Sequence, residues 1–364
     1  MNKDVNNGQS RREFLGRSVA ALAAASFLPS AFSCTGKSVA APAPVDTAAE
    51  AGKVNSKFGG VQIGTITYSW RSMPGGLENI IKYCQEANIS SIELMGGDLE
   101  AYLGAPENPM MKFFRQQAPQ PAAKPGEKPA VPRRMGPPKF TPEQQAEIDK
   151  YKEEVKAWRL GLDLSKVEGA RKLLSDAGIS VHIVKMQPSG MGSDEEVDYA
   201  FKVAKAMGAK AVTDEINLET AKRVAPFAEK HGMYMAFHNH MQYAEEGFSC
   251  DPILAVSPSI MLNFDAGHFF GSTGIHPNEM IKKYHDRIYS IHLKDKTGPT
   301  TGDQPNTNQV WGQGEMPLED VLLLIKQEKW PIYCDIELEY DIKPWSDSVK
   351  EVGTCVKYAR QILM

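Results

Sequence analysis

The chain has 364 residues, of which 42% are hydrophobic and 24% are charged, so it carries enough apolar material for a sizeable core and is not disordered over most of its length. Its formal net charge is −4. Because nucleic-acid-binding proteins gather lysine and arginine on one face, this charge balance argues against nucleic acid as a partner.

The first residues carry the features of an export signal. Two adjacent arginines, Arg11 and Arg12, are followed by Phe14 and Leu15 and then by a weakly apolar, alanine-rich run at 18–28. This pattern is typical of a twin-arginine signal peptide, which we assign to residues 1–34. We therefore expect an exported protein, either periplasmic or anchored to a bacterial membrane.

Cys34 is a candidate lipidation site next to this signal. It follows the small residue Ser33, as a lipoprotein cysteine does, but the bulky Phe32 departs from the usual motif. Lipidation at Cys34 and simple cleavage after Ala40 therefore both stay open. The apolar run is too short for a membrane span, so membrane contact is expected only through a lipid anchor at Cys34. Residues 35–57 are predicted to be a flexible linker.

From Phe58 onward, short β-branched runs alternate with helix-like stretches, as in repeated βα units around a parallel sheet. The predicted strands are residues 61–69, 91–95, 180–186, 211–216, 234–241, 261–264, 288–293 and 331–338. Amphipathic stretches at 77–87, 164–177, 195–207, 219–231 and 318–329 are predicted helices between them. The fold class is therefore α/β, and the alternation predicts a closed (β/α)8 TIM barrel over residues 58–364.

The regular spacing is interrupted once, after the second predicted strand. A proline-rich segment at 119–138 is followed by a charged, helix-like stretch at 143–158. Because such a composition cannot build its own core, residues 104–158 are predicted to be an insertion that forms a loop or lid. The insertion follows a strand end, so we expect it on the catalytic face of the barrel.

Four further cysteines are widely spaced and form no paired zinc-binding motif: Cys84, Cys250, Cys334 and Cys355. Cys84 and Cys355 fall in helix-like stretches, and Cys334 falls in a predicted strand. We expect these residues to be buried thiols.

Acids and histidines recur at the carboxyl ends of the predicted strands, where TIM barrels place their chemistry. In chain order they are Glu93, His182, Asp214 with Glu215, His238 with His240, Asp265 with His268, His292 with Lys294 and Asp295, and Glu337 with Glu339. One such residue alone would more often be a core or capping group, but convergence from so many strands indicates a site. Side chains alternate along a strand, so His238 and His240 share a face, as do Glu337 and Glu339.

These ligand types predict one divalent metal ion. Oxygen and imidazole ligands together suit Mn²⁺, our first choice, with Co²⁺, Mg²⁺ and Zn²⁺ as alternatives. The implied site is open and catalytic.

The same motifs resemble those of the xylose-isomerase-like barrel superfamily, which includes sugar phosphate isomerases and epimerases, ketose 3-epimerases and inosose dehydratases. The resemblance covers roughly residues 58–364 and is carried by His-Asn-His at 238–240, Asp-x-Gly-His at 265–268, His-Leu-Lys-Asp at 292–295 and the acids at 337 and 339. It implies that four residues hold the metal ion, namely Glu215, Asp265, His292 and Glu337. His268 and Lys294 match positions that contact substrate oxygens in that family.

The fifth strand departs from the ketose 3-epimerase pattern, which has a metal-binding glutamate there. This chain has His238 and His240 instead, a similarity to inosose dehydratases. Glu215 can supply the missing carboxylate, and His240, whose ordinary pKa is near 6.5, can act as the acid or base. We therefore assign the catalytic roles to His240, His268 and Lys294, and the substrate-binding roles to His182, His238 and Glu339.

The resemblance implies an isomerase or epimerase that removes a proton next to the carbonyl group of a small sugar or keto-sugar. A keto-sugar lyase or hydratase and a non-catalytic carbohydrate-binding lipoprotein stay open as alternatives. A DNA-repair endonuclease, which shares the barrel, is disfavoured by the acidic charge and the export signal. The sequence contains no strand-linked GxxxxGK loop, and an exported enzyme meets neutral sugars, so a neutral substrate is expected. The sequence leaves open whether the chain forms a homo-oligomer.

Overall fold

The computed structural model describes residues 53–110, 112–113 and 140–364. The chain divides into two units, Met1–Ala48 and Ala49–Met364, and the described residues all belong to the second. The signal segment, Cys34 and the proline-rich segment 119–138 lie outside the described residues, as does most of the linker. Among the helices that are described, none is long and apolar enough to cross a membrane.

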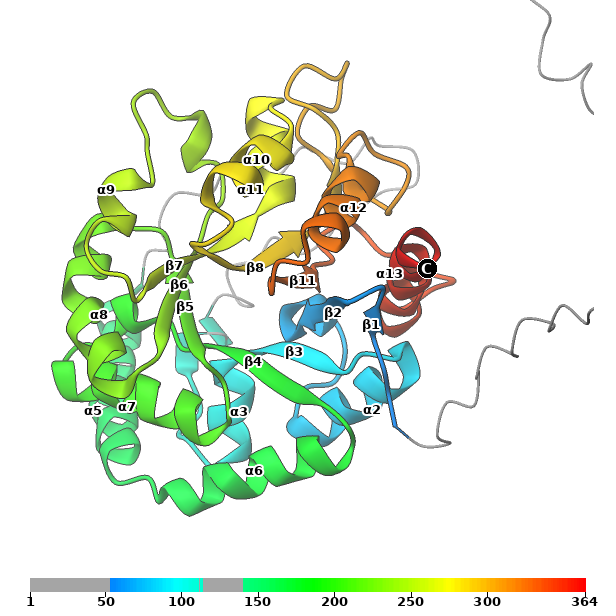
Figure 1. Cartoon of the computed structure of the whole chain (residues 1–364). Helices are drawn as coiled ribbons and strands as arrows, with labels where there is room; N and C mark the ends of the chain where they lie inside the picture. The colour runs from blue at the N-terminus through cyan, green and yellow to red at the C-terminus, as the bar shows by residue number, and fades with distance from the viewer. Residues whose placement is uncertain (1–52, 111, 114–139) are drawn as a thin grey trace, which may run out of the picture. The chain divides into compact units, whose positions relative to one another are not determined.

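Eight parallel strands close into a barrel, which confirms the predicted fold (Figure 1). They are β2 (Val61–Ile66), β3 (Ser91–Met95), β4 (Ser180–Lys185), β5 (Ala211–Glu215), β6 (Tyr234–His238), β7 (Ile260–Asp265), β8 (Ile288–Leu293) and β11 (Tyr333–Ile336). Strand β11 pairs with both β8 and β2, and β2 pairs with β3, so the ring is complete. The short β1 (Lys57–Phe58) pairs antiparallel with β2, and β9 (Asp295–Lys296) pairs with β10 (Asn308–Gln309) in a separate ribbon.

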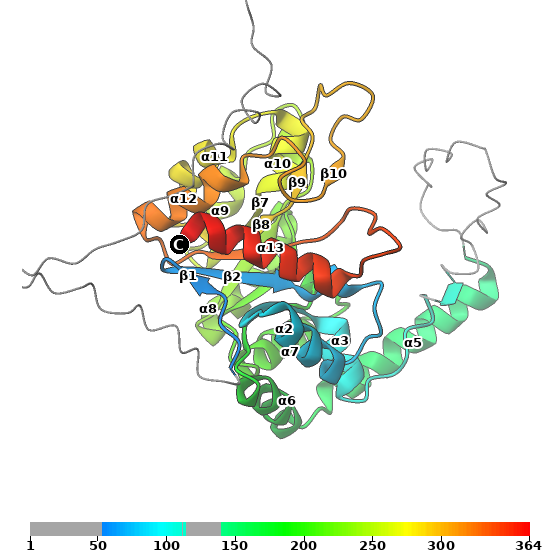
Figure 2. The same cartoon turned by 90° about the vertical axis from the view of Figure 1, so that its right-hand side faces the viewer.

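Helices lie around the outside of the strands (Figures 1 and 2). They are α2 (Leu77–Ala87), α3 (Gly96–Tyr102), α5 (Pro142–Leu160), α6 (Leu164–Asp176), α7 (Asp194–Ala206), α8 (Leu218–His231), α9 (Asp251–Leu254), α10 (Ala266–Thr273), α11 (Pro277–Tyr284), α12 (Leu318–Glu328) and α13 (Ser348–Leu363). Three short 3-10 helices, η1 (Thr67–Trp70), η2 (Pro188–Gly190) and η3 (Gln242–Ala244), lie in loops that follow strands. The main apolar core packs strands against helices, and a small separate cluster contains Ile183, Ala211, Ala236 and Tyr289.

The predicted and observed element bounds differ mainly at the carboxyl ends of strands. The predictions 91–95 and 288–293 match β3 and β8, and the prediction 77–87 matches α2. The predictions 61–69 and 234–241 run too far, because the chain leaves the sheet after Ile66 and His238 and forms the loops that carry polar residues. The four cysteines at 84, 250, 334 and 355 are buried free thiols, as predicted.

Arg159 ties helix α5 of the insertion to the barrel helices. Its Nε donates to Oε1 of Glu100 on α3 at 2.8 Å, and its Nη1 donates to Oε1 of Glu196 on α7 at 3.0 Å. The hydroxyl of Tyr199 donates to the same Glu100 oxygen at 3.1 Å. Burial by itself would lower the pKa of Arg159, but the two carboxylates outweigh it and raise that pKa, so the guanidinium is firmly charged.

Replacing Arg159 by alanine is expected to lower the free energy of unfolding by about 3 kcal/mol, because Glu100 and Glu196 are left as buried, unpaired charges. Urea denaturation at neutral pH measures this loss. The control is Lys152→Ala on the same helix, whose exposed pair with Asp149 should contribute little to stability. A similar small loss for both variants would contradict a structural role for this ion pair.

Asp198 on α7 contacts two lysines and one histidine. Its carboxylate lies 2.7 Å from each of Lys202 Nζ, Lys230 Nζ and His231 Nε2. Burial raises the pKa of Asp198, but the hydrogen bonds from these three neighbours outweigh it and hold that pKa well below its usual range. The depressed pKa means that Asp198 stabilises the fold above its unfolded-state pKa near 4 and loses that contribution as the pH falls further.

The variant Asp198→Asn is therefore expected to be less stable by about 1.5 kcal/mol at pH 7, and the difference from wild type should shrink at pH 3. Urea denaturation of both proteins at the two pH values measures the change. Asp176→Asn is the control, because its pair with Lys172 is exposed and its removal should matter little at either pH. A difference that stays constant from pH 7 to pH 3 would contradict the prediction.

Candidate active site

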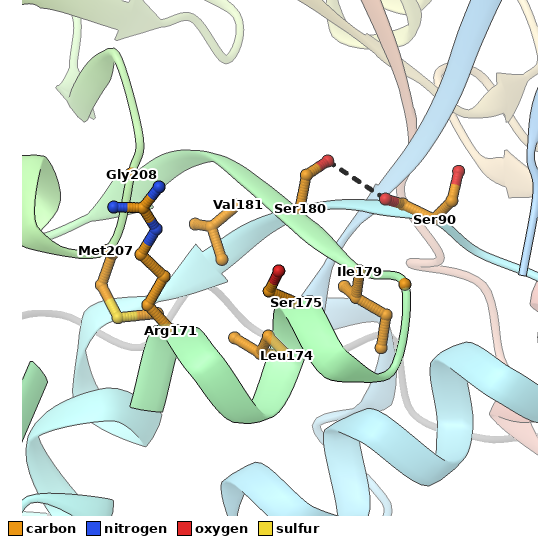
Figure 3. Close-up of a pocket in the computed structure, with 10 residues that line it drawn as sticks. Ser90, Arg171, Leu174, Ser175, Ile179, Ser180, Val181, Met207 and Gly208 are labelled. Atoms are coloured by element: carbon orange, nitrogen blue, oxygen red, sulfur yellow. Dashed lines mark hydrogen bonds between the residues drawn. The ribbon is translucent and has the colours of Figure 1, made fainter. Parts of the chain in front are cut away.

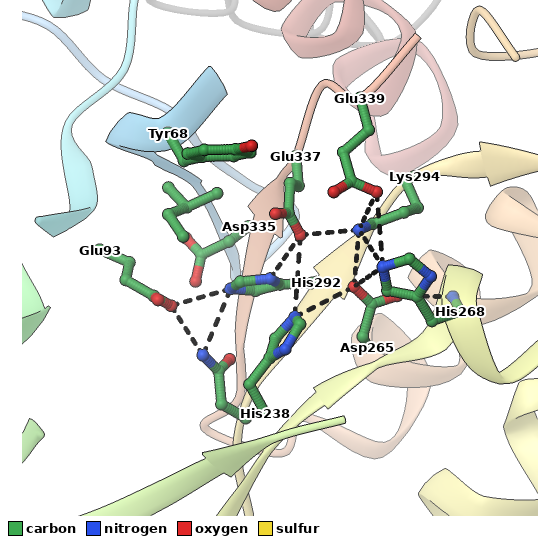
Figure 4. Close-up of polar contacts among 12 residues, drawn as sticks. Tyr68, Glu93, His238, Asp265, His268, His292, Lys294, Asp335, Glu337 and Glu339 are labelled. Carbon is green, nitrogen blue, oxygen red and sulfur yellow. Dashed lines mark hydrogen bonds and ion pairs between the residues drawn. The ribbon is translucent and has the colours of Figure 1, made fainter. Parts of the chain in front are cut away.

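Four side chains from consecutive barrel strands meet at the carboxyl end of the barrel (Figure 4). His238 and Asp265 end β6 and β7, His292 lies near the end of β8, and Glu337 directly follows β11. His238 Nε2 lies 3.2 Å from Asp265 Oδ2 and 3.9 Å from Glu337 Oε2, and His292 Nδ1 lies 2.8 Å from that Glu337 oxygen. All four residues are buried, and one ligand atom from each lies within 4.8 Å of the others.

This group has the donor chemistry of a divalent metal site. Two carboxylates and two imidazoles suit Zn²⁺, Mn²⁺ or Co²⁺, and atoms that share one ion at about 2.1 Å necessarily lie within roughly 4.2 Å of one another. Burial lowers the pKa of His238, but its hydrogen bonds with carboxylates, that with Asp265 first, outweigh burial and raise its pKa to about 9. The carboxylates thus favour positive charge at this point, as a divalent ion would supply.

Asp265 is fixed by contacts on both sides. Its Oδ1 accepts a hydrogen bond from the backbone N–H of His268 at 2.7 Å and so caps helix α10. Its backbone N–H donates to Asn239 Oδ1 at 2.9 Å, and Asn239 Nδ2 donates back to the Asp265 carbonyl at 3.1 Å. The middle residue of the His-Asn-His motif therefore locks the ends of β6 and β7 together, which leaves Asp265 Oδ2 directed at His238.

Lys294 provides the positive charge beside this group. Its ammonium lies 2.9 Å from both Asp265 Oδ2 and Glu337 Oε2, 2.7 Å from Glu339 Oε2 and 3.0 Å from His268 Nε2. Burial lowers the pKa of Lys294, but the three carboxylates outweigh it and raise that pKa, so the ammonium is charged. Burial, together with the nearby ammonium, lowers the pKa of His268 to about 3, so its imidazole is neutral.

Glu215 and His240 lie at the solvent side of His238. Glu215 Oε2 is 3.4 Å from His238 Nδ1 and 3.6 Å from His240 Nδ1, and its other oxygen accepts from Lys185 Nζ at 3.1 Å. The side chains of Glu215 and His240 are 36% and 49% exposed, respectively. Glu215, His238 and His240 thus form a second group of possible metal ligands. His238 belongs to both groups, because it also lies with Asp265, His292 and Glu337.

His182, which was assigned to substrate binding from the sequence, lies apart from the cluster at the mouth of the barrel, that is, at the carboxyl ends of its strands. Its Nδ1 hydrogen-bonds with Ser91 Oγ at 2.8 Å, its Nε2 with Asp335 Oδ2 at 2.8 Å, and its ring stacks on Tyr333. The residue is only 3% exposed. The other residues with an assigned role, including Glu339, either belong to the group of His238, Asp265, His292 and Glu337 or lie next to it.

Two buried carboxylates received no role in the sequence assignment: Glu93 contacts the four-residue group, and Asp335 contacts His182. Glu93 Oε2 lies 2.8 Å from His292 Nε2, so His292 lies between Glu93 and Glu337. A carboxylate on the second ring nitrogen fixes the orientation of a metal-binding histidine. Asp335, which holds His182, lies two residues before Glu337, and the alternation that pairs Glu337 with Glu339 could also have identified it.

A separate cavity of about 450 Å³ lies at the amino ends of β4 and β5 (Figure 3). Ser180 Oγ donates to the Ser90 carbonyl there at 3.1 Å, and Arg171 is the one charged residue among the described residues that line it. The cavity lacks paired acids and bases, so it does not compete with the mouth of the barrel as the reaction site.

Comparison with known proteins agrees with the barrel fold. The model of a family described as "Xylose isomerase-like TIM barrel" matches residues 148–357. The chain belongs to this family. The matched region of this xylose isomerase-like barrel contains all four residues of the buried group, namely His238, Asp265, His292 and Glu337.

Individual relatives are distant. An inosose dehydratase of Clostridium botulinum is 28% identical over 137 residues, which cover 33% of this chain and 45% of the relative, so the match spans less than half of that protein. The structure of the probable 3-DHS dehydratase AsbF from Bacillus anthracis is similar with a TM-score of 0.52 at 11% identity, covering 82% of this chain and 98% of that one. The IolI protein with a bound zinc atom has a TM-score of 0.50 at 13% identity, covering 83% and 98%. These structural likenesses show the shared barrel fold.

Proposed function

We propose that the chain is a divalent-metal-dependent carbohydrate enzyme of the isomerase or epimerase type, which removes the proton next to a carbonyl group of a neutral sugar or keto-sugar. The observation that carries the proposal is the convergence of His238, Asp265, His292 and Glu337 at the barrel mouth. Family membership and the zinc atom in the IolI structure support it.

The ion would be held by these four residues. When bound, a divalent ion supplies a Lewis acid that stabilises negative charge developing on a substrate carbonyl oxygen. Glu93 holds the ring of His292 in its orientation, and Lys294 balances the charge of Asp265 and Glu337. The buried carboxylates are thereby positioned before substrate arrives.

His240 is the acid or base in this proposal. Its imidazole is half exposed at the mouth and is oriented by Glu215, which lies 3.6 Å from its Nδ1. The ring lies 4.9 Å from the His268 ring and 4.9 Å from the His238 ring, measured between centroids. A sugar carbon that enters above the four-residue group therefore comes within reach of His240, which accepts the proton while the electron pair of the C–H bond moves toward the carbonyl oxygen.

A neutral substrate agrees with the charges at the mouth. Lys294 already contacts three carboxylates, and Lys185 is paired with Glu215. Neither ammonium is left unpaired for a phosphate group. We propose that the enzyme acts after export, because the twin-arginine motif at residues 11–12 precedes the barrel.

A dehydratase or lyase is the second candidate. It is favoured by His238, since this strand carries a histidine where ketose 3-epimerases have a glutamate, and by the similarity to inosose dehydratases. In that reaction the same proton is lost, and the electron pair expels an oxygen substituent from the next carbon.

Incubation of the Mn²⁺-loaded protein with neutral keto-sugars and with sugar phosphates in deuterated water tests the proposal. We expect neutral keto-sugars to react, as judged by NMR and mass spectrometry. Deuterium at the α-carbon with all oxygens retained identifies an epimerase or isomerase, and loss of water or an alcohol identifies the second candidate. Turnover confined to sugar phosphates, or no exchange with any keto-sugar, would overturn the proposal.

A further inference from the structure

Two cavities flank helix α3 beside the candidate metal centre. The first, here called the Tyr68 cavity, has a volume of about 470 Å³ and is lined by residues of η1, α2 and α3 that include Tyr68 and Trp70. The second, the Tyr151 cavity, has a volume of about 570 Å³ and is lined by residues from α3, α5 and the loop after β4, including Tyr151. Both volumes fall in the range of small-molecule binding sites.

Each cavity is linked to the centre through one intermediate residue. Arg71, which lines the Tyr68 cavity, donates from Nη1 to the carbonyl of Leu338 at 2.5 Å, and Leu338 lies between Glu337 and Glu339. Tyr68 itself is drawn with the cluster in Figure 4. Lys185, which lines the Tyr151 cavity, donates to Glu215, and Glu215 lies 3.4 Å from His238. Arg71 and Lys185 thus join the linings of the two cavities to residues next to the centre.

The two cavities meet at Gly97. Met95 and Gly97 line both of them, and a Cβ atom placed on Gly97 would have no atom within 4 Å. The absence of a side chain at Gly97 therefore keeps a passage between the cavities open. We call the combined feature the α3 groove.

The lining of the α3 groove has the chemistry of a neutral carbohydrate site. Tyr68 and Tyr151 offer aromatic faces, and Asn108 and Gln187 offer amide donors and acceptors. The indole N–H of Trp70, which also lines the groove, is buried and finds no acceptor among the described residues. The charged residues that line the groove are three cations and three carboxylates, namely Arg71, Arg159, Lys185, Asp98, Glu100 and Glu107. This lining has no net positive charge, which disfavours a phosphate ligand.

We propose that the substrate is a neutral glycoside or oligosaccharide of at least two units, with the reacting ring at the metal centre and a neighbouring unit in the α3 groove. This inference rests on the proposed function for the identity of the reacting ring. A free monosaccharide at the centre would leave both cavities unfilled. The groove therefore determines the size of the substrate.

The Gly97→Leu substitution tests the groove without disturbing the core. Gly97 is exposed on α3, and leucine has a higher helix propensity than glycine, so the Gly97→Leu variant should fold normally while its side chain blocks the passage. The matched control is Gly169→Leu, because Gly169 is also an exposed helical glycine with no atom within 4 Å of a Cβ, but it lies on α6 outside the groove.

The full-length, Mn²⁺-loaded proteins are assayed with 3-keto-glucose as the one-ring probe and with the 3-keto derivatives of cellobiose, maltose and lactose as two-ring probes. We expect wild type to prefer at least one two-ring probe by about tenfold in kcat/KM, a difference of about 1.4 kcal/mol. Gly97→Leu should remove this preference and leave the one-ring rate unchanged, and Gly169→Leu should match wild type. Equal rates on one-ring and two-ring probes in wild type, or an equal effect of Gly97→Leu on both, would overturn the inference.

Binding of the unoxidised disaccharides separates failure of the groove from failure of the proposed function. Cellobiose, maltose and lactose lack the keto group, so saturation-transfer NMR reports their binding without catalysis. Binding of one of them to wild type that is lost in Gly97→Leu and kept in Gly169→Leu supports the groove even if no keto-sugar reacts. No binding of any of the three to wild type overturns the groove even if 3-keto-glucose is turned over.

Discussion

Replacing Asp265 by asparagine is expected to reduce bound Mn²⁺ from about one ion per chain to a small fraction and to lower kcat/KM by at least about 100-fold. Asp265 Oδ2 lies 3.2 Å from His238 Nε2 inside the proposed ligand group. Asparagine keeps the oxygen that caps α10, so the loss reports the missing charge rather than a broken helix. Plasma mass spectrometry of the purified, dialysed protein measures the metal content.

The matched control is Asp163→Asn. Asp163 is also an aspartate that caps a helix, because it accepts from the backbone N–H of Ser165 at the start of α6, but it is exposed and remote from the barrel mouth. Its variant should keep wild-type metal content and activity. Full metal occupancy in Asp265→Asn would remove Asp265 from the ligand group.

Replacing Lys294 by methionine is expected to lower kcat by about 100-fold to 1,000-fold, because its ammonium balances the carboxylates beside the candidate metal centre and keeps the potential there favourable for the negative charge that develops on the substrate oxygen. Methionine has a similar length and keeps the apolar contacts of the stem. The variant leaves Asp265, Glu337 and Glu339 without their shared cation. Removal of the metal with a chelator should therefore destabilise this variant by about 3 kcal/mol more than wild type.

Thermal or urea unfolding with and without Mn²⁺ separates the two effects of that substitution. If Lys294 offsets the charge of the carboxylates, added Mn²⁺ should restore most of the stability of Lys294→Met but not its activity. Lys172→Met is the control, because Lys172 is exposed and its partner is the exposed Asp176. Wild-type activity in Lys294→Met would contradict a role for its ammonium in the reaction.

The barrel could be predicted because each βα unit carries its own local signal. The strands are buried on both faces and read as apolar runs, and glycines follow several helices, as Gly232 does after α8 with a φ of 62°. Helix α10 was not predicted, because its start is encoded by a single capping contact from Asp265 and its sequence includes Gly267. Local periodicity could not reveal it.

Side-chain alternation along the strands predicted only part of the site. Alternation identified which residues face the barrel mouth, but the assignment of Glu215 or His238 to the four-residue group depends on how β5 and β6 are staggered. In the structure Glu215 pairs in register with His238, and it lies on the solvent side of the histidine ring. The support of His292 by Glu93 joins residues 199 positions apart, which no local pattern shows.

A crystal structure of the Mn²⁺-loaded protein, with anomalous data at the manganese edge, tests the central claim most directly. We predict one anomalous peak at the carboxyl end of the barrel, with one atom of each of His238, Asp265, His292 and Glu337 at about 2.0–2.3 Å from it. A peak bound by Glu215 and His240 without Asp265, or no peak within the barrel mouth, would contradict it.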